Sequence, residues 1–310
     1  MRLFYCDHFE LPLPEGHRFP MQKYALLRQA VLDLGLAAVG NLHVPVAVSD
    51  EEIERAHDPA YVHRVVCGEL SRQEIRRIGF PWSPALVERS RRSAGGTVAA
   101  CRAAMDDGVS ANLAGGTHHA ARACGEGFCV FNDSAIAARA LQAEGRVARV
   151  AVVDCDVHQG NGTAEIFEDD PSVFTVSVHG VNNFPFRKHR SDVDIELEDG
   201  ARDDAYLAAV ERGVRAALAA PLPDLMIYVS GADPLDRDRL GRLSVTPGAL
   251  EVRDRLVFAE ARRAGVPVAV SMAGGYAPDV GDTVAVHVAT VREAARSAAT
   301  WTANHVSHQP

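Results

Sequence analysis

Short runs of consecutive apolar residues punctuate the chain, at residues 3–5, 147–153, 173–178, 225–229 and 266–270. Strands whose apolar residues are consecutive rather than alternating are buried on both faces, as in a parallel sheet that helices cover. The segments between these runs carry helical patterns and helix-capping residues. The alternation of strands and helices predicts an α/β fold.

Capping residues locate several of the helices. Ser49 and Glu52 have the spacing of a capping box, and Ser83 precedes Pro84 as a cap residue precedes proline at the first helical position. From Pro84 one long helix is predicted, with Gly108 as its stop. The acidic stretch at residues 192–204 is interpreted as a surface loop that leads into a helix. No repeat, low-complexity tract or linker divides the chain, so residues 1–310 are predicted to form a single doubly wound domain with a central parallel sheet.

The composition is that of an ordinary globular protein, with 47% apolar and 24% charged residues. The formal net charge of −9 argues against binding to nucleic acid or an anionic membrane surface, since both require clustered Lys and Arg. Arg89, Arg91 and Arg92 are interpreted as a solvated helix face rather than a nucleic-acid patch. The charge suits a cationic, amine-bearing substrate, but a charge of this size is also normal for solubility.

The sequence predicts a cytoplasmic location. The first residues are polar and acidic too early for the apolar core of a signal peptide, and no stretch reaches the roughly 18 to 20 apolar residues of a spanning helix. Six cysteines form no CxxC pair, which favours thiols in a reducing compartment over disulfides.

Polar residues with metal-binding chemistry follow two of the predicted strands. Asp154, Asp156 and His158 come directly after residues 147–153, at alternate positions that point to one side of a strand end. Asp233 follows residues 225–229. Two carboxylates and one imidazole would leave a zinc ion an open position for water and a substrate oxygen.

Two further glycine-rich segments also stand at predicted strand ends, where α/β folds gather their functional groups. Gly115 and Gly116 precede Thr117 and the adjacent pair His118 and His119, which forms either part of a site or a polar loop. The second segment ends in Tyr276, whose phenol could face a developing oxyanion or fill a turn.

Taken together, these segments resemble the signature motifs of the histone deacetylase family. The segments are residues 115–132 (GGTHHAARACGEGFCVFN), 154–162 (DCDVHQGNG), 231–241 (GADPLDRDRLG) and 273–276 (AGGY). HisGlnGlyAsnGly at 158–162 and the early run at residues 17–21 are most similar to the class IV and bacterial branch. The match extends from about residue 3 to residue 290 in the family's order. It implies an arginase/deacetylase fold, with helices on both sides of a central parallel sheet of about eight strands.

The resemblance implies a role for each group of the site. The zinc ligands would be Asp156, His158 and Asp233. His119 would be the general base, His118 its electrostatic partner, and Tyr276 a hydrogen-bond donor to the substrate carbonyl. The family pattern places Asp154 behind His118 and Asn161 behind His119, so His118 should have more imidazolium character while His119 stays neutral.

The resemblance also implies a potassium site and a substrate channel. The potassium ligands would be Asp154, Ser177 and the backbone carbonyls of Asp156, His158 and Val178. The substrate-binding residues would be Phe128, Phe184, Gly127, Leu240 and Gly275, with Phe128 and Phe184 as aromatic walls. Thr117 stands where many relatives have an aromatic residue, which predicts a roomier pocket floor.

The leading hypothesis is therefore zinc-dependent hydrolysis of an acyl amide on a lysine side chain of a protein or peptide. A small-molecule amidohydrolase, such as an acetylpolyamine deacetylase, uses the same machinery, and an inactive acyl-lysine binding module is a third hypothesis. A two-manganese site of the arginase type would need carboxylates where this chain has Gly160 and Leu235, so one metal ion is predicted. The ligand set does not choose strongly between zinc and Fe(II). The acyl length, the physiological substrate and the oligomeric state stay open.

Overall fold

The apolar runs become strands of one parallel sheet. The computed structural model describes residues 1–9, 11–219 and 221–306, and its sheet has the strand order β2-β1-β3-β8-β7-β4-β5-β6. The strands are β1 (Leu3–Phe4), β2 (Leu42–His43), β3 (Val109–Asn112), β4 (Val150–Asp154), β5 (Val173–Gly180), β6 (Val193–Leu197), β7 (Leu225–Ser230) and β8 (Val268–Met272). All pairs are parallel, which confirms the predicted doubly wound architecture.

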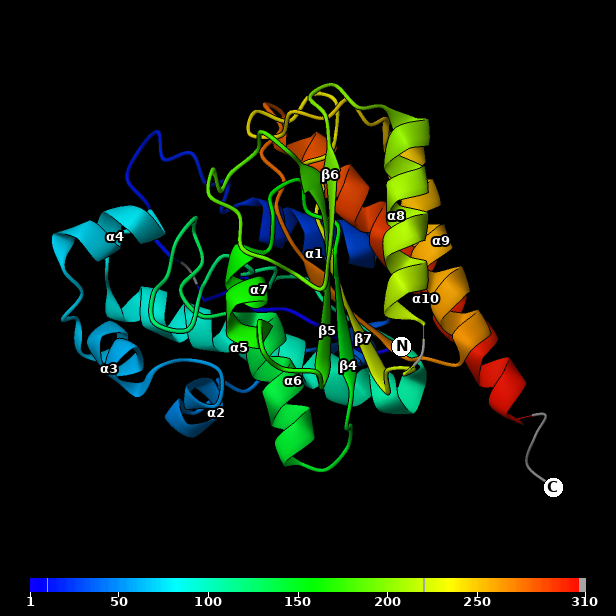
Figure 1. Ribbon diagram of the computed structural model, residues 1–310, viewed down its shortest axis with the longest axis horizontal. Coiled ribbons are helices and arrows are strands. Elements are labelled where there is room, and N and C mark those ends of the chain that lie inside the picture. Colours follow the sequence, from blue (N-terminus) through cyan, green and yellow to red (C-terminus); the bar gives the residue numbers. More distant parts are fainter. Residues whose placement is uncertain (10, 220, 307–310) are drawn as a thin grey trace.

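Helices cover both faces of the sheet (Figure 1). The helices are α1 (Lys23–Asp33), α2 (Asp50–Glu54), α3 (Pro59–Cys67), α4 (Arg72–Ile78), α5 (Pro84–Asp107), α6 (Asp133–Ala143), α7 (Asn161–Phe167), α8 (Asp203–Ala217), α9 (Pro247–Ala264) and α10 (Val280–Val306). Helices α8, α9 and α10 lie on one face and α5, α6 and α7 on the other. None of the helices in the described ranges is long and apolar enough to cross a membrane.

The consecutive apolar residues of β4 show why such a run predicts a central strand. Ala151 and Val153 pack in the core on the side of α8 and α9, while Val150 and Val152 pack in the core on the side of α5 and α6. All four side chains are buried, because each face of the strand meets helices. A strand with one solvated face would need polar residues at every second position.

The predicted helix boundaries agree closely with the structure. Ser49 caps α2 in a complete capping box with Glu52. Ser83 accepts a hydrogen bond from the Leu86 amide at the start of α5, and Gly108 ends that helix with a φ of 78°. A residue with a side chain would be strained at that angle, which is why glycine is favoured there.

Two expectations from the sequence were wrong. Residues 192–204 are not a continuous loop, because β6 forms within them before α8 begins. This edge strand alternates exposed and buried positions (exposed Asp194 and Glu196, buried Ile195 and Leu197), so a search for consecutive apolar residues misses it. Arg89 is buried rather than solvated: its guanidinium donates to the Cys6 and Phe9 carbonyls and lies 4.6 Å from the centre of the Tyr24 ring.

A buried ion pair supports the end of β7. Arg253 and Asp254 on α9 are fully buried, and the Arg253 guanidinium lies 2.8 Å from the Asp254 carboxylate. Arg253 also donates to the carbonyl of Gly231 (2.6 Å) and to the Ser230 hydroxyl (2.9 Å). The pair therefore anchors the backbone that leads directly to Asp233.

Arg253→Met is expected to lower the free energy of unfolding by about 3–5 kcal/mol, because it leaves the Asp254 carboxylate buried without its cation. Arg215→Met is the control: Arg215 is exposed on α8, and losing its surface pair with Glu211 should cost about 1 kcal/mol or less. Urea denaturation of both variants measures the difference. Equal losses would show that the buried pair adds nothing beyond a surface pair.

Candidate functional site

The predicted motifs meet because the strands that precede them are neighbours. In the sheet, β3, β8, β7 and β4 are adjacent, in that order. The chain leaves β3 towards His118 and His119, β8 towards Tyr276, β7 towards Asp233, and β4 towards Asp156 and His158. Since carboxyl ends of parallel strands share one edge of the sheet, four segments far apart in sequence converge there.

Asp156, His158 and Asp233 form a compact group in which one ligand atom of each lies within 4.8 Å of the others. His158 Nδ1 lies 2.9 Å from Asp156 Oδ1 and 3.2 Å from Asp233 Oδ2. The second oxygen of each carboxylate is held by the backbone: the Val157 amide donates to Asp233 Oδ1 and the Gly274 amide to Asp156 Oδ2. A Cβ at Gly274 would lie 1.9 Å from Asp233, so only glycine permits this approach.

The charges of Asp156, His158 and Asp233 favour the binding of a cation. Burial and the neighbouring Asp156 raise the pKa of Asp233 to about 7, and the buried Asp233 Oδ2 makes no hydrogen bond, although His158 Nδ1 lies 3.2 Å away. Burial opposes a charge on His158, yet its contacts with Asp156 and Asp233 raise its pKa to about 10. Two carboxylates around one imidazole, with an oxygen left unsatisfied, fit a divalent ion that would take the place of the His158 proton.

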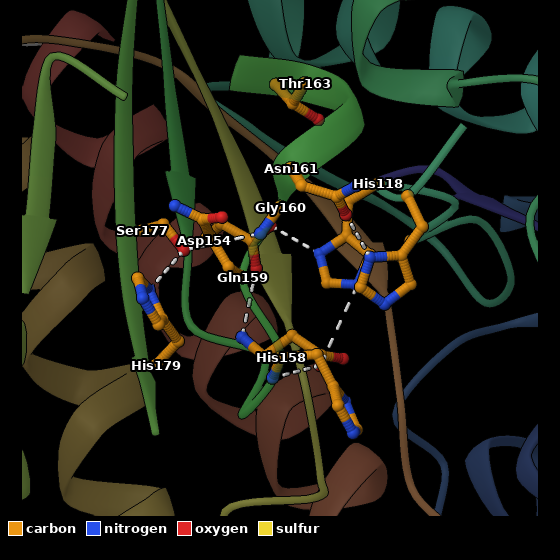
Figure 2. A network of polar contacts seen from close by, with 12 residues as sticks. His118, Asp154, His158, Gln159, Gly160, Asn161, Thr163, Ser177 and His179 are labelled. Atoms are coloured by element: carbon orange, nitrogen blue, oxygen red, sulfur yellow. Dashed lines mark hydrogen bonds and ion pairs between the residues drawn. The ribbon is translucent and has the colours of Figure 1, made fainter. Parts of the chain in front are cut away.

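The two adjacent histidines have different partners, as the resemblance implies. His118 Nδ1 lies 2.6 Å from Asp154 Oδ2 and His119 Nδ1 lies 2.6 Å from Asn161 Oδ1. Figure 2 shows His118, Asp154 and Asn161 around the start of α7. Burial disfavours the charged form of His118, but Asp154 and Asp156 outweigh it and raise its pKa to about 9. Burial, His118 and His158 hold the pKa of His119 well below its ordinary value, so His119 is neutral.

Sequence reasoning missed the residue that orients Asn161. The Asn161 amide Nδ2 donates to Glu126 Oε1 (3.0 Å), and the other oxygen of Glu126 accepts from Arg77 (2.7 Å). Because Glu126 accepts from the NH₂ group, the Asn161 oxygen faces His119, whose Nδ1 then carries the proton and leaves Nε2 free to accept one. Glu126 lies in the motif at residues 115–132 between two glycines, but no spacing rule connects it to Asn161.

Glu126→Ala is expected to lower kcat by about 2- to 10-fold, because it removes the one hydrogen bond from Glu126 that holds the Asn161 amide in this orientation. Glu126→Gln should retain most of the activity, since a glutamine oxygen can still accept from Asn161. Steady-state kinetics that separate kcat from KM check this pair. A loss in KM alone, or equal losses in both variants, would contradict the positioning role.

Two more residues that the sequence analysis did not single out fix the turn before Tyr276. Lys23, the first residue of α1, is almost fully buried, and its ammonium donates to the Ala273 carbonyl (3.1 Å). Burial lowers the pKa of Lys23 to about 8, although Asp233 and Asp156 oppose that shift. Asp238 accepts from the Tyr276 amide (2.5 Å) and from the amides of Leu240 and Gly241. Lys23 lies two residues after the run at residues 17–21, which was the only sequence signal for this segment.

A cavity of about 520 Å³ opens onto these groups. It is lined by Asp156, His158, His118, His119 and Tyr276, and its size suits a small-molecule group or a side chain. Of the predicted substrate-binding residues, the structure places Phe128, Phe184, Gly127 and Leu240 in the lining. It does not place Gly275 there: a Cβ on Gly275 would face Thr283 and Ala232, and Gly274 lines the cavity instead.

The structure shows the contacts of Thr117, at the predicted pocket floor, and of Asp154 and Ser177, the predicted potassium ligands. Thr117 lines the cavity and donates its hydroxyl to Asp133 (2.8 Å). Asp154 and Ser177 are register partners in the paired strands β4 and β5. A Cβ at Gly160 would lie 2.4 Å from Asp154 Oδ2, and the Ser177 hydroxyl lies 3.0 Å from His179 Nδ1 (Figure 2). The potassium site, including the carbonyls of Asp156, His158 and Val178, stays a prediction.

Comparison with known proteins agrees with this arrangement. The family model of the histone deacetylase domain matches residues 17–291. The chain belongs to the histone deacetylase family. As a member of this metal-dependent family of amide hydrolases, it contains each of the motifs from which the resemblance was drawn. The match covers all four strand ends that converge at the cavity.

Relatives and solved structures resemble this histone deacetylase family member over most of its length. An uncharacterized protein of Picosynechococcus sp. is 43% identical over 91% of this chain and 94% of its own. A histone deacetylase-like amidohydrolase of Pseudomonas aeruginosa is 31% identical over 92% of this chain and 80% of its own. The crystal structure of a histone deacetylase homolog from Aquifex aeolicus superposes with a TM-score of 0.82 at 22% identity, covering 95% of this chain and 84% of that one, and confirms the fold.

Proposed function

We propose that this protein is a zinc-dependent deacylase that hydrolyses the acyl amide of a modified lysine side chain. The observation that carries the proposal is the placement of neutral His119 beside the Asp156, His158 and Asp233 group on one cavity. A base with a free lone pair, a divalent-ion site and a phenol within one cavity are the components of metal-assisted amide hydrolysis.

Asp156, His158 and Asp233 would hold the ion. When bound, a zinc ion would supply Lewis-acid polarisation of the amide carbonyl and would make a water easier to deprotonate. The unsatisfied Asp233 oxygen and the raised pKa of His158 support a cation at this point. Fe(II) is the alternative ion for the same ligands. We also propose a potassium ion beside Asp154 and Ser177, where it would offset the crowded carboxylates.

The side chains around the cavity would divide the proton transfers. His119 Nε2 would accept the proton of the attacking water, since Nδ1 is committed to Asn161. Tyr276 would donate its hydroxyl to the oxyanion as the carbonyl carbon becomes tetrahedral. Burial, Asp156 and Asp233 raise its pKa well above the ordinary value, so the phenol keeps its proton. His118, held charged by Asp154, would stabilise the developing negative charge, and an imidazole would return a proton to the leaving amine.

The walls of the cavity favour a lysine-like substrate. The Phe128 and Phe184 rings line it, and Phe184 stands edge-on to His119 with ring centroids 4.9 Å apart. Aromatic walls would pack against the apolar methylenes of an acyl-lysine side chain and guide its amide towards His119.

The test is a panel of acyl-lysine peptides, from acetyl to myristoyl, together with N-acetylputrescine. Hydrolysis should occur with peptides, disappear after chelation, and return when Zn²⁺ or Fe²⁺ is added to the metal-free protein. The metal that restores the greater rate identifies the preferred ion, and the best peptide gives the acyl length. Peptide hydrolysis that persists after verified removal of all metal would refute the proposed function.

A further inference from the structure

The entrance of the cavity is strongly cationic in a protein whose net charge is −9. The side chains that we call the cationic rim are exposed and line the cavity: Arg18, Arg76, Arg77, Arg239 and Arg242. Among residues 1–9, 11–219 and 221–306, Asp156 supplies the only carboxylate in the cavity lining, and it belongs to the candidate metal site. The charge of the entrance is therefore opposite in sign to that of the whole protein.

Two of the five rim arginines pair with carboxylates, and three do not. Arg77 pairs with Glu126 and Arg242 with Asp199 (3.1 Å). For Arg18, Arg76 and Arg239, no carboxylate within the described part of the chain lies at ion-pair distance, and Arg239 reaches only the Pro278 carbonyl at 3.5 Å. These guanidinium groups keep their donors available for a ligand at the entrance.

A structural explanation covers part of the rim only. Arg76 and Arg77 lie in the last turn of α4, where cations offset the helix dipole. Arg18 and Arg239 lie outside helices and strands, so no helix end accounts for their charge. The rim is contributed by three separate segments, the one before α1, the end of α4 and the loop after β7, which converge on one opening.

Resting on the proposed function, we propose that the cationic rim selects acyl-lysines whose neighbouring residues in the peptide are acidic. Acylation removes the positive charge of the lysine side chain. The arginines at the entrance therefore interact with the charges of the peptide residues that flank the acyl-lysine. Carboxylates of Asp or Glu match guanidinium donors in geometry and charge. Cationic amides such as acetylated polyamines, and lysine-rich peptide segments, meet repulsion at the same arginines.

The test uses the zinc-loaded protein and short peptides with one central acetyl-lysine, flanked by glutamates, alanines or lysines, with N-acetylputrescine as a cationic small amide. We expect kcat/KM to fall from the acidic to the neutral peptide by about tenfold, the size of a few exposed ion pairs, and to fall further for the basic peptide. High salt should reduce the difference in kcat/KM between the acidic and basic peptides, because it screens exposed charges. The double variant Arg18→Glu/Arg239→Glu should reverse the order, whereas Arg212→Glu, an exposed arginine on α8 outside the cavity lining, should leave it unchanged.

Binding of the same fluorescent peptides, followed by anisotropy, separates this proposal from the deacylase assignment. If the acidic peptide binds more tightly and the double variant loses this preference, the role of the cationic rim is supported, whether or not any peptide is hydrolysed. If no peptide is hydrolysed, the deacylase assignment is refuted. Hydrolysis of all three peptides at equal rates and with equal affinities would overturn the rim and leave the deacylase intact. An acidic preference that survives the double charge reversal would overturn it as well.

Discussion

His119→Ala is expected to lower kcat by roughly 10²–10⁴, the contribution typical of a positioned general base. The Nδ1 of His119 is held by the Asn161 oxygen at 2.6 Å, so only Nε2 can accept a proton from water in the cavity. The low pKa of this ring, caused by burial and by the neighbouring His118 and His158, keeps the lone pair available at neutral pH. His118 cannot replace it, because the charges of Asp154 and Asp156 keep His118 protonated.

His57→Ala is the matched control for the loss of a buried imidazole. His57 is buried with its ring nitrogens bonded to the Ala121 carbonyl and the Asn132 amide, so its loss should lower stability and leave kcat of the folded protein within a few-fold. Single-turnover kinetics at matched zinc content measure the chemical step in both variants. A kcat within tenfold of wild type for His119→Ala, with zinc bound, would mean that another group is the base.

The parts of the fold that the sequence predicted are those fixed by local physical rules. Central strands such as β4 are buried on both faces and therefore read as continuous apolar runs. The capping residues Ser83 and Gly108 mark the beginning and the end of α5. The strand β6 was missed because an edge strand exposes one face. Arg89 was wrongly placed on the surface because the residues next to it in sequence do not reveal that its guanidinium bonds to the distant carbonyls of Cys6 and Phe9.

The candidate site divides in the same way. Residues inside motifs at strand ends, such as Asp156 and Asp233, could be placed because parallel strands bring their carboxyl ends together. Lys23 and Glu126 act through contacts between segments far apart in sequence, with Ala273 and with Asn161, that no spacing encodes. The cationic rim is a similar case: its arginines are scattered in the sequence and only the fold gathers them.

Tyr276→Phe is expected to lower kcat by roughly 10²–10³, the usual effect of removing one hydrogen-bond donor to an oxyanion. The variant keeps the aromatic ring, which packs near Phe19 and Phe128, so the cavity wall should be preserved. The backbone of residue 276 also stays in place, because Asp238 holds its amide and Lys23 the Ala273 carbonyl. The loss should therefore appear in kcat, with KM nearly unchanged, since the donor acts chiefly once the oxyanion forms.

Tyr24→Phe provides the comparison, because Tyr24 lines the same cavity and burial likewise raises the pKa of its phenol, to about 12. Tyr24 carries no assigned role, so losing its hydroxyl should change kcat by no more than a few-fold. Equal losses in the two variants would point to a general effect of cavity polarity. A Tyr276→Phe defect confined to KM would assign Tyr276 to ground-state binding, because uniform binding energy alters KM without altering the chemical step. Only a loss in kcat specific to Tyr276 fits a phenol that meets the oxyanion.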